Sequence, residues 1–147
     1  MEHLEHPSLH VWEERRLWFE RVVEEMQGEG GYLVSEQASA LLAEVQAVFC
    51  AGAWAAVIIL SMAVVDAQLR ESEMPGFEGN TAKLIDAAGA DPELHRLRRR
   101  RNALVHVDAD NPALTVEHQW EARTALEQEA RDAVRLMFRA FFLSPWV

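Results

Sequence analysis

Residues 47–65 form a run of nineteen residues without a charge, and this run constrains the fold more than any other part of the chain. Its length is close to what a helix needs to cross a bilayer. However, Cys50-Ala51-Gly52-Ala53 lies inside it and is typical of a helix that stops and restarts. Charged residues of both signs flank the run, without the positive bias on one side that orients a membrane segment. We therefore expect one buried helix to end here and a second to begin, with no membrane span.

Apolar residues recur at three- and four-residue steps along most of the chain, which predicts helices. No segment shows the alternation of a strand convincingly. Ser8, Asn80 and Asp91 have the polar side chains that cap helix N-termini, and Pro92 suits a first helical position. The helix from residue 54 is apolar nearly all round until Asp66, so it should be the most buried. The predicted fold is all-α, an up-and-down bundle of five to six helices in a single domain, residues 1–147. The expected helices cover residues 10–27, 35–51, 54–73, 81–88, 92–106 and 117–142.

The composition narrows the classes of partner. The formal net charge is −10, which argues against a general nucleic-acid coat because neutralising phosphates needs a positive surface. Any anion site must therefore be local. A single cysteine, Cys50, excludes an intrachain disulfide and a cysteine zinc site. This fits a reducing compartment, and we expect the cytoplasm. His3, His6 and His10 have metal-compatible spacing, but Pro7 interrupts it, so we expect a polar tail and no metal.

Positive charge gathers in one short segment. Five of the fourteen basic residues lie within residues 96–101. In a helix, Arg101 shares one face with an apolar stripe made of Leu94, Leu97, Leu104 and Val105. A guanidinium keeps its proton and is costly to bury alone, so Arg101 requires an anionic partner, a subunit interface or a ligand.

A polar stripe is predicted beside the apolar one, formed by His95, Arg99, Asn102 and His106. Arginine binds phosphate through a planar fork of donors, and histidine exchanges protons near neutral pH. For Arg96, Arg99 and Arg100 we favour a solvated basic face, and for Arg101 with His106 a functional role. Asp66 either neutralises Arg101 or orients His106, or it marks where its helix reaches solvent.

Leu97-Arg98, Arg101-Asn102 and His106 together resemble the signature of the HEPN superfamily, the higher eukaryotes and prokaryotes nucleotide-binding domains. Its motif is an arginine, usually followed by a polar residue, with a histidine a few positions on. Residues 51–57 and the apolar helix that ends in Asp66 are similar to the helical pair before this motif in one bacterial branch. The resemblance extends over residues 35–142.

The resemblance implies a metal-independent endoribonuclease that works as a homodimer, with the paired motifs facing each other across a cleft. Arg101, His106 and Asn102 then match the catalytic positions, with Asp66 and Arg98 as supporting residues and no cofactor. It also implies a toxin or defence component with an antitoxin or other partner protein. Two alternatives stay open. One is a non-catalytic HEPN dimer that binds a nucleotide or a protein, and the other is a helical interaction protein in which Arg101 and Asp66 form a structural ion pair.

Overall fold

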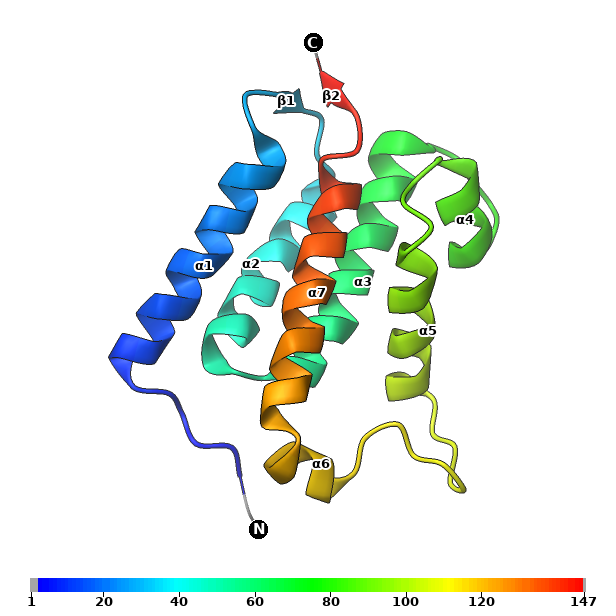
Figure 1. Ribbon diagram of the computed structural model, residues 1–147. Coiled ribbons are helices and arrows are strands. Elements are labelled where there is room, and N and C mark those ends of the chain that lie inside the picture. Colours follow the sequence, from blue (N-terminus) through cyan, green and yellow to red (C-terminus); the bar gives the residue numbers. More distant parts are fainter. Residues whose placement is uncertain (1–2, 147) are drawn as a thin grey trace.

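Five long helices run alternately up and down in the computed structural model, which describes residues 3–146 (Figure 1). The all-α bundle predicted from the sequence is confirmed. Two short helices lie in the connections, and a single π-helical turn, η1, extends α3. The helices are α1 (Leu9–Gln27), α2 (Glu36–Ala51), α3 (Trp54–Gln68), η1 (Leu69–Glu73), α4 (Thr81–Ala87), α5 (Leu94–Val105), α6 (Val116–Glu121) and α7 (Arg123–Phe141).

Helix α3 is the central element, as its uniformly apolar sequence predicts. It packs against α2, α5 and α7 (Figure 1), and its buried side chains include Trp54, Ile58 and Met62. The expected stop and restart between α2 and α3 is present, because Gly52 adopts a left-handed conformation with φ of 79°. Within residues 3–146, no helix is both long and apolar enough to cross a membrane.

Polar caps fix where several helices begin. The Ser8 side chain accepts a hydrogen bond from the Val11 amide, and Asn80 accepts one from the Lys83 amide, so both predicted caps are confirmed. Helix α5 begins at Leu94, two residues later than predicted. The Asp91 carboxylate does accept from the Glu93 amide. However, the first backbone hydrogen bonds, from the amides of residues 94–96, each reach the carbonyl oxygen three residues back, as in a 3₁₀ turn. The α-helix begins at Leu94, within this turn.

The predicted helix over residues 117–142 is interrupted at Ala122, which separates α6 from α7. The next residue, Arg123, donates to the Gly52 carbonyl oxygen and lies over the Trp54 ring, 5.7 Å from its centroid. Burial and the neighbouring Arg15 charge lower the pKa of Arg123. These contacts hold the start of α7 against the end of α2 and the start of α3.

The C-terminal aromatic residues cover one end of the bundle. Phe138 and Phe141 are buried, and Phe142 stacks on Phe138 with 5.7 Å between ring centroids. Beyond them, two residues of β2 (Pro145–Trp146) pair antiparallel with β1 (Gly31–Tyr32). This pair was not predicted, since two residues are too few to show the alternation of a strand.

Candidate functional site

The arginines of helix α5 have different surroundings: some form ion pairs or lie on the surface, and one lines a pocket. Arg100 donates to Glu129 of α7 at 2.6 Å and to the Ala113 carbonyl oxygen at 3.1 Å. Arg96 pairs with Glu93 at 3.1 Å, and Arg99 is exposed. Arg96 and Arg99 are therefore exposed, in line with the predicted solvated face, whereas Arg100 is part-buried and forms a structural pair with α7, which that prediction did not include.

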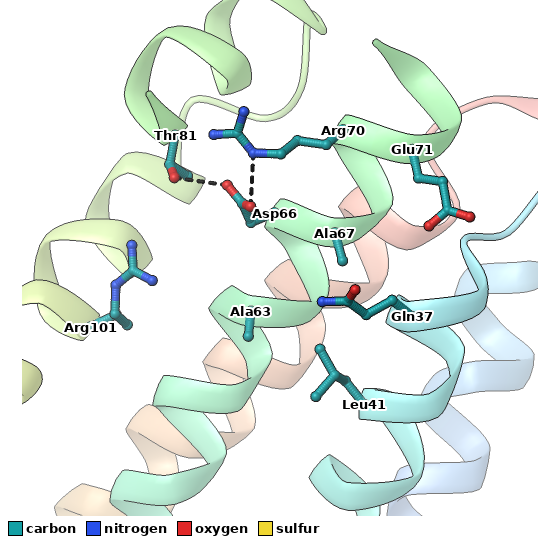
Figure 2. A pocket seen from close by; sticks show the side chains of 9 residues that line it. All are labelled: Gln37, Leu41, Ala63, Asp66, Ala67, Arg70, Glu71, Thr81 and Arg101. Carbon is teal, nitrogen blue, oxygen red and sulfur yellow. Dashed lines mark hydrogen bonds and ion pairs between the residues drawn. The ribbon is translucent and has the colours of Figure 1, made fainter. Parts of the chain in front are cut away.

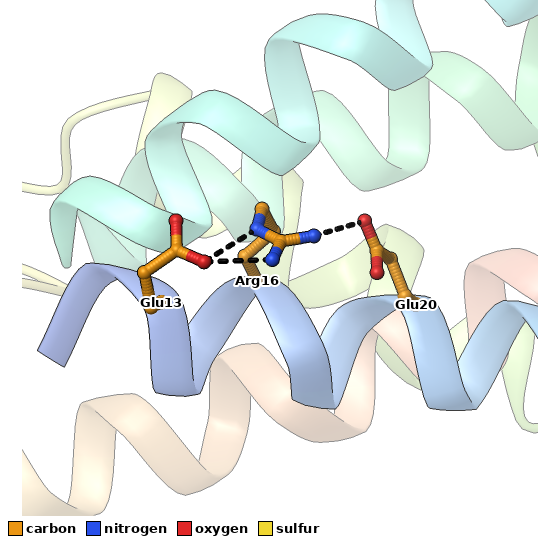
Figure 3. A network of polar contacts seen from close by, with 3 residues as sticks. All are labelled: Glu13, Arg16 and Glu20. Carbon is orange, nitrogen blue, oxygen red and sulfur yellow. Dashed lines mark hydrogen bonds and ion pairs between the residues drawn. The ribbon is translucent and has the colours of Figure 1, made fainter. Parts of the chain in front are cut away.

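Arg101 differs from these neighbours. It is half-buried, and its Nε donates to the Asn102 Oδ1 at 2.8 Å. Among residues 3–146, no carboxylate forms an ion pair with it. Arg16 on α1 shows the opposite situation, because Glu13 and Glu20 both bind its guanidinium at 2.7 Å and raise its pKa (Figure 3). The terminal nitrogens of Arg101 thus remain available to a ligand.

These nitrogens face an open pocket between α2, α3, α4 and α5. Its volume is about 480 Å³, within the usual size range of a small-molecule site. Figure 2 shows Arg101 on one side of this pocket and Gln37, Leu41 and Glu71 on the other, with α3 between them. The complete lining consists of Gln37, Leu41, Ala63, Asp66, Ala67, Arg70, Glu71, Thr81 and Arg101. We call this the α3 pocket.

Asp66 lines the α3 pocket but does not neutralise Arg101, so the pairing considered from the sequence is wrong. One carboxylate oxygen accepts from the Arg70 Nε at 2.9 Å, and the other accepts from the Thr81 hydroxyl at 2.8 Å (Figure 2). Arg70 also donates to the Gly79 carbonyl oxygen at 3.0 Å. Asp66 therefore joins α3 to the start of α4. Both Asp66 oxygens are thus used by Arg70, one turn further along the same helix, and by Thr81.

The π-helical turn η1 places two further side chains in the pocket wall. The Met74 amide bonds to the Leu69 carbonyl oxygen, five residues back, so this turn holds one residue more than an α-helical turn. Such turns are rare and occur often at functional sites. Arg70 and Glu71 both belong to this turn and line the pocket. Glu71 is held there by the Ser35 hydroxyl, which donates to it at 2.6 Å.

The remaining motif residues lie outside the pocket lining. Asn102 is half-buried and reaches the site only through its bond to Arg101. His106 is exposed and ends α5 with extended backbone angles, φ −118° and ψ 110°. The expected polar stripe therefore does not continue to His106 in helical geometry. Arg98 is half-buried, and its Nε has no hydrogen-bond partner among the described residues. One chain alone does not bring His106 into the α3 pocket.

Sequence reasoning missed four polar residues of the pocket: Gln37, Arg70, Glu71 and Thr81. Arg70 had a usable signal, because it follows Asp66 at the four-residue spacing that favours ion pairs on a helix. The others had none, since their positions depend on how three helices pack.

Cys50 and the metal-binding residue types add no second candidate site among residues 3–146. Cys50 is 1 % exposed, and burial raises the pKa of its thiol, so it is a small core residue as expected. Within residues 3–146, no group of three or more histidine, cysteine, aspartate or glutamate side chains is arranged to hold a metal ion. Comparisons with protein-family models, with curated proteins and with solved structures found no match.

Proposed function

We propose that this chain is a HEPN-type, metal-independent endoribonuclease that acts as a homodimer with a composite site of Arg101 and His106. The observation that carries the proposal is the state of Arg101. It is a half-buried guanidinium on an apolar stripe, it has no carboxylate partner among the described residues, and it faces an open pocket. A permanent charge in such a position is costly unless an anion binds it, and RNA phosphate is the anion that the motif suggests.

The chemistry needs few groups. A ribose 2′-hydroxyl attacks the adjacent phosphorus, the bond to the 5′-oxygen breaks, and a 2′,3′-cyclic phosphate forms. A base must take the 2′-hydroxyl proton, an acid must protonate the leaving 5′-oxygen, and positive charge must stabilise the phosphorane. His106 performs the proton transfers in this proposal, and Arg101 supplies the charge. Asn102 is a positioning residue, because its bond to the Arg101 Nε holds the guanidinium fork towards the pocket.

A second copy is required because His106 is exposed at the end of α5 and does not line the pocket that Arg101 faces. In the proposed dimer, the His106 residues of both copies approach the shared RNA, and each Arg101 binds phosphate. Asp66 supports the site by holding Arg70 and Thr81 in the pocket wall. Arg98, half-buried on the same helix, is a further supporting residue in this proposal. The proposed setting is the cytoplasm, where a toxin or defence component would meet RNA and its antitoxin partner.

The test is cleavage of single-stranded RNA in the presence of EDTA. Wild-type protein is compared with Arg101→Ala and His106→Ala, and Arg96→Ala serves as a control that removes an exposed arginine from the same helix. Both motif variants should lose about a hundredfold or more of the activity, the usual contribution of a general acid or base, while the control retains it. Equal activity in all four proteins would indicate contamination and reject the proposal. Sedimentation should show a dimer, and a strict monomer would count equally against it.

A non-catalytic HEPN dimer that binds a nucleotide or a partner protein is the second candidate. It is favoured by one observation: the α3 pocket has both cationic and anionic groups in one chain without needing His106. This candidate predicts no RNA cleavage, together with a melting temperature that rises on adding a nucleotide. The absence of any shift in a nucleotide screen would argue against nucleotide binding.

A further inference from the structure

The α3 pocket is polarised from one side to the other. Arg101 of α5 lies at one side, and of its nitrogens only Nε donates a hydrogen bond to another described side chain, that of Asn102. Gln37 of α2 and Glu71 of η1 lie at the other side (Figure 2). Both of these residues are exposed, and the Glu71 Oε1 has no partner among the described residues. A ligand that crosses the pocket therefore needs an anionic group at one end and hydrogen-bond donors at the other.

Part of the pocket surface between these two sides consists of small and apolar side chains. Ala63 and Ala67 are half-buried residues one turn apart on α3, and Leu41 of α2 lies beside them. Side chains of this size leave the helix surface open to a flat group, which gains free energy by covering apolar area.

We infer that the α3 pocket binds one nucleotide of the RNA, with its phosphate on Arg101 and its base over Ala63 and Ala67. We infer further that it selects adenine and cytosine, which carry an amine at the ring position where guanine and uracil carry a carbonyl oxygen. This inference rests on the proposed function for the choice of RNA as ligand. Glutamate accepts hydrogen bonds from the amine of cytosine, and glutamine pairs with the amine and ring nitrogen of adenine. Uracil has a carbonyl oxygen where cytosine has its amine. This oxygen and the Glu71 carboxylate are both hydrogen-bond acceptors, so they repel each other. Adenine and cytosine are therefore preferred to uracil.

Binding of AMP, CMP and UMP to the full-length protein, measured by titration calorimetry, tests the selection directly. AMP and CMP should bind about tenfold more tightly than UMP, the discrimination of one good polar contact to a base. Glu71→Gln keeps the size of the side chain and removes its charge, so it should reduce the preference of CMP over UMP to about twofold or less. Glu44→Gln, which alters an exposed glutamate of α2 outside the pocket, should leave the preference unchanged. Equal affinity of the three nucleotides for wild-type protein overturns the inference.

A variant that fills the pocket tests nucleotide binding independently of Glu71. Ala67→Leu should weaken AMP binding about tenfold or more, because the added side chain occupies the place of the base. Ala47→Leu, at an exposed alanine of the same α2 surface that bears Glu44, is the size-matched control. Unchanged AMP affinity in folded Ala67→Leu protein overturns the inference.

The cleavage assay separates this inference from the proposed function. Loss of RNA cleavage in Arg101→Ala, together with equal binding of AMP and UMP to wild-type protein, leaves the nuclease proposal standing and rejects base selection. Selective binding of AMP and CMP without any RNA cleavage supports the pocket assignment and rejects the nuclease.

Discussion

Replacing Arg101 by methionine separates a structural role of this residue from a ligand-binding one. Methionine keeps the length of the side chain and restores an apolar residue to the stripe formed with Leu97 and Leu104. If Arg101 were half of a structural ion pair, its loss would leave a carboxylate unpaired and cost several kcal/mol. The structure gives it no such carboxylate among the described residues, so we expect a small effect on stability and a large effect on any function of the site.

The expected change in the free energy of unfolding follows from the contacts that each substitution removes. Arg101→Met loses one partly exposed hydrogen bond, the 2.8 Å contact to Asn102, which is worth about 0.5–1.5 kcal/mol. The apolar contacts that methionine adds offset part of this, so the net change should stay within about 1 kcal/mol. Asp66→Ala instead loses two side-chain bonds, one to Arg70 one turn along the same helix at 2.9 Å and one to Thr81 of α4 at 2.8 Å. The Asp66 side chain is 30 % exposed, and after discounting for screening we expect a loss of about 1.5–3 kcal/mol.

Urea unfolding at neutral pH measures both variants against wild-type protein. For a domain of this size, about 1 kcal/mol shifts the melting temperature by roughly 2–4 °C, so calorimetry provides a second reading. Arg100→Met is the matched control, because it removes an arginine that does pair, with Glu129 at 2.6 Å. A loss in Arg101→Met as large as that in Asp66→Ala would refute the assignment of Arg101 to a ligand and favour the structural ion-pair alternative.

Three further predictions concern other parts of the fold. Cys50 should not react with a thiol reagent in the native protein below about pH 8, because burial raises the pKa of its thiol, and rapid labelling of folded protein would contradict this. Gly52→Ala should lower the free energy of unfolding by about 1–2 kcal/mol, because φ is 79° and the new Cβ would lie 2.9 Å from the Arg15 Nη1. An unchanged urea midpoint would be evidence against that strain. The Glu93 amide and Arg139 hold the pKa of Asp91 below its ordinary value of 3.8, so its ionised form stabilises the fold. This stabilisation should be fully present above about pH 4 and disappear as the pH falls through the lowered pKa, so an Asp91→Asn difference that stayed constant down to acid pH would disprove it.

Local patterns predicted most of the helices and their starts. Ser8 and Asn80 cap the helices expected of them, and the glycine at position 52 ends α2 in the left-handed conformation. These features depend on residues within one turn of each other, so a sequence reveals them. The break at Ala122 was missed, and the contact beside it joins Arg123 to the Gly52 carbonyl oxygen, 71 positions away in the chain.

The pairing of Asp66 shows the same difference between contacts within one helix and contacts that depend on tertiary packing. Arg70 is one turn along the same helix, so the pair forms without ordering any loop. Arg101 is on another helix, and its distance from Asp66 is set by how α3, α4 and α5 pack. The four-residue spacing therefore favours Arg70 as the partner of Asp66, a pair that the sequence analysis did not consider.

By itself, the sequence determined that Arg101 lies on an apolar stripe of a helix, because helical spacing follows from backbone hydrogen bonds alone. It also determined that α3 is central, since a helix without a polar face has to be covered by others. The tertiary structure decided that Arg101 has no carboxylate partner among the described residues and faces the α3 pocket. That outcome depends on the distances between helices, which arise from the packing of side chains far apart in the chain.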